Sequence, residues 1–86
     1  MRPKIQDAQI EEMILGYIRG VRPLAGVDNA SVLDSKLRRI LDSMDVLELT
    51  AYLEQSFALK ISDEDIVRRN FDTVRSVIDF VRRKVE

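Results

Sequence analysis

The sequence contains no cysteine and no histidine. Without cysteine the chain cannot form a disulfide bond, a thiolate metal site or a cysteine nucleophile. Without histidine it lacks the usual general base near neutral pH and the commonest neutral metal ligand. We therefore expect no self-contained hydrolase. Any thiol chemistry would need a thiol supplied from outside the chain.

Long apolar runs and an excess of one charge are also missing. No segment approaches the roughly 18–20 apolar residues that span a bilayer, so we expect no membrane span and a cytoplasmic location. The net charge of −1 gives no long-range positive field of the kind that nucleic-acid binders use, so we expect no binding of nucleic acid. We also expect the protein to be a monomer. With 86 residues, 45% of them hydrophobic, the chain is suited to a single small domain over residues 1–86.

Apolar residues recur at steps of three and four in three segments, which is the spacing of amphipathic helices. The pattern predicts four helices, at about 7–19, 42–57, 62–68 and 72–85. Three are long, and the third in chain order is short. Asp7, Ser62 and Asp72 are expected to cap the first, third and fourth helices. Glycine and proline interrupt the pattern after the first helix, which predicts a long loop before the second. The expected fold class is all-α, a small four-helix bundle.

The segment "ILDSMDVLEL", residues 40–49, marks the start of the second helix. With Asp42 as N-cap, Leu41 and Val46 take the two positions of a hydrophobic staple, and Asp45 favours the positive end of the helix dipole. Ser43 can be interpreted in two ways. Next to a helix start, serine usually serves as a cap. A phosphate esterified to its hydroxyl would also be favoured by the helix dipole and nearby amides.

The second helix carries more apolar residues than one buried face needs. One stripe, expected to face the core, consists of Val46, Leu49, Leu53 and Phe57. A second stripe consists of Met44, Leu47 and Ala51, flanked by Asp45, Glu48 and Glu54. Residues 42–57 include four acids and no base. This second stripe could dock a partner, or the helix could be buried over a wide arc.

The chain resembles the family of acyl carrier and peptidyl carrier proteins over about residues 8–84. The family's Asp-Ser-Leu motif, followed by a helix that ends in Leu-Glu-x-x-Phe, is matched by "DSMD" at 42–45 and "LEQSF" at 53–57. The later "KISDEDI" and "NFDTV" segments strengthen the match. Methionine at position 44 replaces the usual leucine. Arg38 and Arg39 bring positive charge where many relatives have a glycine and acids. The "ILDS" segment, together with the later "NFDTV", resembles discrete carriers of specialised pathways.

The resemblance implies that Ser43 receives 4′-phosphopantetheine from coenzyme A through a separate, magnesium-dependent transferase. The thiol of that arm would hold acyl or aminoacyl groups as thioesters, and the chain itself would be a non-catalytic carrier. Its expected partners are the transferase, a loading ligase, and downstream acyl-processing or condensing enzymes. The residues expected to contact them are Asp42, Met44, Asp45, Leu47, Glu48, Ala51 and Glu54.

Two other interpretations remain open. The same acidic and apolar stripe could belong to an unmodified protein-interaction module. Arginines near helix ends could indicate a helix-turn-helix DNA binder, although such residues more often favour the helix dipole. Asp63, Glu64 and Asp65 are adjacent and do not follow the spacing of a calcium-binding loop, so we expect no metal site there.

Overall fold

The computed structural model describes residues 7–85, and within them the only regular secondary structure is helical. The elements in order are α1 (Asp7–Val21), α2 (Asn29–Asp34), α3 (Leu37–Ile40), α4 (Ser43–Phe57), the 3₁₀ turn η1 (Asp63–Asp65) and α5 (Val74–Val85). The predicted all-α class is confirmed. Asp7 is the first described residue of α1, so its expected capping role depends on residues outside the described part.

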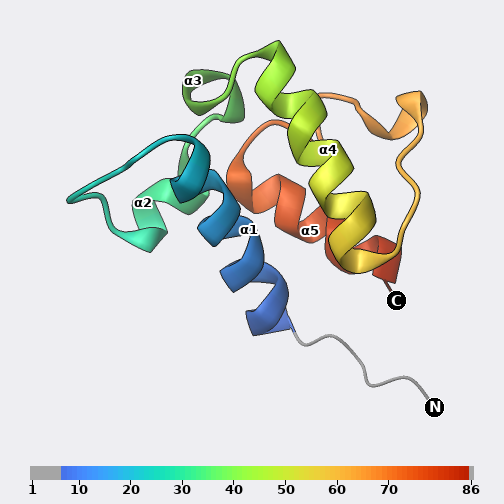
Figure 1. The fold of residues 1–86 in the computed structure, drawn as a ribbon, viewed down its shortest axis with the longest axis horizontal. Coiled ribbons are helices and arrows are strands. Elements are labelled where there is room, and N and C mark those ends of the chain that lie inside the picture. Colours follow the sequence, from blue (N-terminus) through green and yellow to red (C-terminus); the bar gives the residue numbers. More distant parts are fainter. Residues whose placement is uncertain (1–6, 86) are drawn as a thin grey trace.

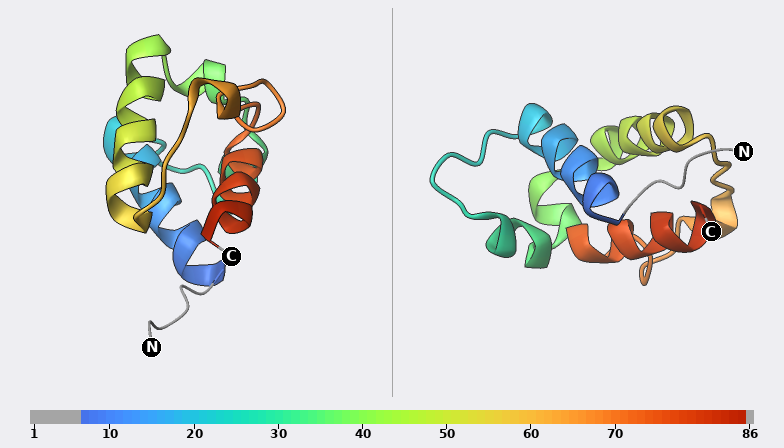
Figure 2. Two further views of the ribbon diagram at one scale, coloured as in Figure 1. Left: turned by 90° about the vertical axis from the view of Figure 1, so that its right-hand side faces the viewer. Right: turned by 90° about the horizontal axis from the view of Figure 1, so that it is seen from below.

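Three long helices build the core (Figure 1). α1 runs opposite to α4 and α5, and it packs against α5 (Figures 1 and 2). The core-facing side chains of each long helix follow the helical spacing predicted from the sequence. Fully buried members are Ile10, Ile14 and Ile18 of α1, Leu49 and Leu53 of α4, and Val74, Val77 and Val81 of α5.

The segment between α1 and α4 is not the single long loop that the sequence predicted, because it contains α2 and α3. The carboxylate of Asp28 caps α2 by accepting the Ser31 amide at 2.8 Å. The side chain of Arg19 donates to the carbonyl of Val27 at 2.8 Å and so holds the preceding turn. Both helices also bury side chains in the core. Helices of six and four residues are too short to show a periodic pattern in the sequence.

The predicted third helix at 62–68 is only the single turn η1. The carboxylate of Asp65 accepts hydrogen bonds from both the amide and the hydroxyl of Ser62, at 3.1 Å each. Ile66 and Val67, which would continue the helix, are 36% and 39% exposed. A longer helix here would gain little burial, and short helices depend on packing of an apolar face for their stability.

The last helix begins at Val74, and its cap is Thr73 rather than the predicted Asp72. The Thr73 hydroxyl accepts the Ser76 amide at 3.1 Å, and the Ser76 hydroxyl accepts the Thr73 amide at 2.9 Å. Asp72 instead forms an ion pair with Lys36 at 2.9 Å. An aspartate is a good cap by composition, but here its carboxylate serves to join the segment before α5 to the segment before α3.

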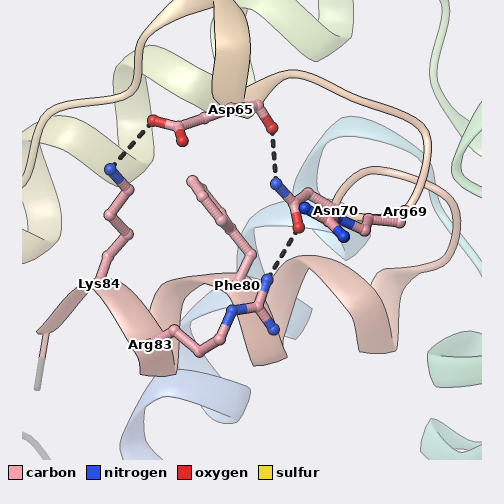
Figure 3. A pocket seen from close by; sticks show the side chains of 6 residues that line it. All are labelled: Asp65, Arg69, Asn70, Phe80, Arg83 and Lys84. Atoms are coloured by element: carbon pink, nitrogen blue, oxygen red, sulfur yellow. Dashed lines mark hydrogen bonds and ion pairs between the residues drawn. The ribbon is translucent and has the colours of Figure 1, made fainter.

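α4 and α5 run in the same direction, so residues 58–73 return along the molecule between them (Figure 2). Figure 3 shows how this segment is fixed to α5. Asn70, which is 7% exposed, donates to the carbonyl of Asp65 and accepts from Arg83, both at 2.8 Å. Lys84 pairs with the Asp65 carboxylate at 3.0 Å. These polar groups line an open pocket and are bonded to one another across it.

Candidate functional site

α4 begins at the predicted N-cap, Asp42, and the structure adds a reciprocal capping box with Asp45. The Asp42 carboxylate accepts the Asp45 amide at 2.8 Å, and the Asp45 carboxylate accepts the Asp42 amide at 3.3 Å. Leu41, next to the cap, is 3% exposed and anchors the chain in the core. Two carboxylates and one buried leucine therefore fix the direction in which α4 leaves the core.

Ser43 is the first residue of α4 and is exposed. Because Asp42 occupies the N-cap position, the Ser43 hydroxyl is not needed for capping, and it has no hydrogen-bond partner within residues 7–85. The amides of Ser43 and Met44 likewise have no protein acceptor in that part of the chain. The positive end of the helix dipole thus lies beside an accessible hydroxyl. The capping interpretation of Ser43 is wrong, because the structure gives that role to its neighbour.

The second apolar stripe of α4 lies on the surface. Met44 is 68% exposed and Leu47 is 63% exposed, whereas Leu49 and Leu53 are completely buried. Ala51 and Glu48 are exposed beside them. Burial of α4 over a wide arc is therefore excluded. An exposed apolar patch framed by carboxylates is the composition that marks a protein-docking surface.

Glu54 differs from the other acids that the sequence placed on this surface. Its carboxylate accepts the Ile61 amide at 2.9 Å and is only half-exposed. The chain reverses here through Ala58, whose φ of 52° lies in the left-handed region that ends many helices. Glu54 therefore stabilises the turn after α4, and Asp45 is engaged by the Asp42 amide and by Arg22. Of the acids in this group, Glu48 alone makes no hydrogen bond or ion pair within residues 7–85.

A shallow hollow lies between α1 and α4, beside the exposed stripe. The rings of Tyr17 and Tyr52 stack in it with centroids 4.4 Å apart, and the Tyr52 hydroxyl donates to the Met13 carbonyl at 3.3 Å. Burial and the nearby carboxylates of Glu48 and Asp45 raise the pKa of the Tyr17 hydroxyl. Both tyrosines are partly buried against the core.

Sequence reasoning missed Arg22 as part of this site. Its Nε donates to the carbonyl of Ile40 at 3.0 Å, and its Nη2 lies 3.7 Å from a carboxylate oxygen of Asp45. The end of α1 is thereby joined to the chain on both sides of the α3–α4 connection. Arg22 stands 18 residues before Ile40, in a segment without periodicity, so no local pattern could have identified the contact.

Comparison with known proteins agrees with this geometry. Residues 21–81 match the family described as "Phosphopantetheine attachment site". The chain belongs to this family of carrier proteins. It is 35% identical over 71 residues to the acyl carrier protein of Buchnera aphidicola subsp. Schizaphis graminum, covering 83% of this chain and 84% of that relative.

Two further acyl carrier proteins, from strains of Buchnera aphidicola subsp. Acyrthosiphon pisum, are 44% identical over 43 residues, which cover 50% of this chain and 51% of each relative. No solved structure gives a significant match to the chain. The cofactor of the family is 4′-phosphopantetheine, and its proteins carry groups rather than transform them.

The residues at the start of α4 fit this cofactor. A phosphodiester needs an accessible hydroxyl, and amides that point at it without another acceptor favour its negative charge. Ser43 offers the hydroxyl, and its own amide and that of Met44 lie beside it.

Over residues 7–85, no helix is long and apolar enough to cross a membrane, and no group of three or more acidic side chains could hold a metal ion.

Proposed function

We propose that this carrier bears 4′-phosphopantetheine on Ser43 and presents acyl or aminoacyl groups to partner enzymes. The arm supplies a terminal thiol that forms thioesters, which the cysteine-free chain cannot do alone. The protein's own contribution is to display the hydroxyl, orient the arm and dock its partners. In this proposal it catalyses no step and acts as a monomer in the cytoplasm.

The observation that carries the proposal is the exposed and unengaged hydroxyl of Ser43. A serine that served only as a cap would bond the third amide of the helix, and that amide is already bonded to Asp42. The capping box holds the first turn rigid, so a transferase would meet the hydroxyl in one orientation. Preorganised positioning of a reacting group lowers the entropic cost of the reaction.

The exposed stripe of α4 supports the second half of the proposal. Met44, Leu47 and Ala51 offer apolar contact, while Asp42, Asp45 and Glu48 offer negative charge to a partner's basic residues. This docking surface begins one residue from the attachment point. A partner bound to it would therefore hold the arm near its own active site. We propose the transferase, a loading ligase and acyl-processing or condensing enzymes as these partners.

The test is incubation with coenzyme A, magnesium and a broad-specificity phosphopantetheinyl transferase, followed by intact-protein mass measurement. We expect the wild-type protein to gain one phosphopantetheine and the Ser43→Ala variant to gain none. Ser62→Ala is the matched control, because Ser62 also precedes an acidic helical turn and is exposed. If the Ser62 variant lost modification while the Ser43 variant kept it, the assignment of the site would be wrong.

The unmodified interaction module is a second candidate, favoured by the exposure of Met44 and Leu47. A module of this kind would bind its partner equally well with or without the arm. Binding of a loading ligase to the wild-type, modified protein and to Ser43→Ala separates the two candidates. Transfer of cargo to the modified protein alone would support the carrier.

A further inference from the structure

Two arginines lie shortly before Ser43 in the chain, and their side chains make no hydrogen bond or ion pair within the described residues. Arg38 and Arg39 lie in α3 and are exposed, while Leu37 and Ile40 of the same short helix are buried. Within residues 7–85, neither guanidinium lies within ion-pairing distance of an acid. Only two residues separate α3 from α4, and the two helices adjoin at one end of the molecule (Figure 1).

Arg22, the residue directly after α1, brings a third positive charge to the same place. One carboxylate oxygen of Asp45 lies 3.7 Å from the Arg22 guanidinium and 3.3 Å from the amide of Asp42. The guanidinium is therefore held close to the residue that immediately precedes Ser43. Its side chain remains 52% exposed, so it can still face a group attached to that serine.

A phosphate on Ser43 would meet an electrostatic problem that these arginines offset. Asp42 lies directly before the serine and Asp45 lies two residues after it, so a phosphodiester adds a third negative charge to a short stretch. Like charges at this spacing repel one another. Both carboxylates are fixed by the capping box and cannot turn away without loss of the cap.

We propose that Arg22, Arg38 and Arg39 form a basic rim that stabilises the phosphate group of the arm on Ser43. The same rim favours the phosphates of the incoming coenzyme A. This inference rests on the proposed function. The arginines touch no reacting atom, and they act by their charge on the product and on the donor.

The first experiment measures the coupling between the arginines and the phosphate. The melting temperature is determined with and without the arm for the wild type, for Arg38→Gln/Arg39→Gln and for Arg68→Gln/Arg69→Gln. The control pair is also exposed and adjacent and carries the same charge change, but it lies in the segment between η1 and α5. Arg22 is left intact because its hydrogen bond to Ile40 contributes to the fold.

At low salt, we expect attachment of the arm to raise the melting temperature of the wild type and of the control by about 2 °C more than that of the Arg38/Arg39 variant. The difference should vanish near 0.5 M salt, where the interaction between exposed charges is screened beyond a few ångströms. Arg38→Lys/Arg39→Lys should restore it, because the effect is one of charge. The proposal would be overturned if attachment of the arm raised the melting temperature equally in all variants. It would also be overturned if the lysine variant showed the same smaller rise as the glutamine variant.

The second experiment measures transferase kinetics. We expect the KM for coenzyme A to rise about threefold in Arg38→Gln/Arg39→Gln, with kcat unchanged, because the donor's phosphates lose an attractive field. The control pair should leave both constants unchanged. An unchanged KM, or the same change in the control, would contradict the basic rim. Failure of the wild type to accept any arm would instead contradict the proposed function.

Discussion

α4 and α5 are both long helices against the same core, and they use their apolar residues differently. In α5, the five residues Val74, Val77, Ile78, Phe80 and Val81 are all buried. In α4, only Leu49, Leu53 and Phe57 are buried. Two other large apolar residues of α4 are more than 60% exposed, and both lie within five residues of the serine.

The contrast distinguishes apolar residues that stabilise the fold from apolar residues that the fold does not need. The sequence of α5 is explained by packing alone, since its apolar face lies on the core and its charged residues lie outside. Folding would be satisfied by polar residues at positions 44 and 47 of α4. Exposed apolar side chains next to a proposed attachment site therefore indicate selection for binding.

The largest expected effect sharpens this contrast within α4. Leu53→Ala should lower the free energy of unfolding by about 3 kcal/mol, because it leaves a cavity in a fully buried site. Leu47→Ala should change it by less than about 0.5 kcal/mol, since that side chain is already in solvent. Denaturant unfolding followed by circular dichroism measures both. Equal losses for the two leucines would show that the exposed stripe is part of the core.

The next effect concerns docking. Glu48→Lys should reduce the catalytic efficiency of modification or loading about tenfold, equivalent to about 1.4 kcal/mol, with helical circular dichroism unchanged. Glu64→Lys is the matched control, because Glu64 is also exposed but lies in η1. The proposed docking surface predicts a slow rate only for the first variant. Unchanged kinetics in Glu48→Lys would remove Glu48 from that surface.

A smaller effect tests the division of roles between Asp42 and Ser43. Asp42→Ala should cost about 1 kcal/mol of unfolding free energy, because the Asp45 amide loses its acceptor. Ser43→Ala should cost less than about 0.5 kcal/mol, because the serine is not the cap. Thermal or denaturant unfolding of the unmodified proteins gives both values. A larger loss for Ser43→Ala than for Asp42→Ala would restore the capping role to the serine.

The smallest effect is a dependence of stability on pH in the acid range. Hydrogen bonds from Ser62 and the Lys84 ammonium lower the pKa of Asp65, and bonds from Ser31 lower the pKa of Asp28. A carboxyl whose pKa is lower in the folded state stabilises the protein above its ordinary value of 3.8. That contribution is lost as the pH falls through the folded pKa. Melting curves of Asp65→Asn should depend less on pH below about 4; a dependence identical to wild type would contradict this role.

The start of α4 could be predicted from the sequence because its determinants are local. The cap, its reciprocal acid and the two apolar stripes all lie within one short run, and helical spacing assigns each to a face. The spacing separated Met44 and Leu47 from the stripe that faces the core, but it left open whether α4 is buried over a wide arc, and the exposure of both residues decides that point. The resemblance to carrier proteins supplied the cofactor.

The remaining features depend on contacts between distant segments. Arg22 acts on Ile40 and Asp45, Asp72 is taken from its helix by Lys36, and Glu54 accepts an amide beyond the end of its own helix. Such contacts follow from the packed fold and leave no periodic signal in the chain. The same holds for α2 and α3, which bury side chains in the core and are bonded by Arg19 at Asn29 and by Arg22 at Ile40.

The most direct test is to locate the added mass on the modified protein. After incubation with coenzyme A, magnesium and the transferase, fragmentation mass spectrometry of the peptide spanning residues 40–49 assigns the modified side chain. We expect one phosphopantetheine on Ser43 and none on any other residue. A protein that stays unmodified with several transferases, or that carries the arm elsewhere, would contradict the claim that the Ser43 hydroxyl is the attachment point.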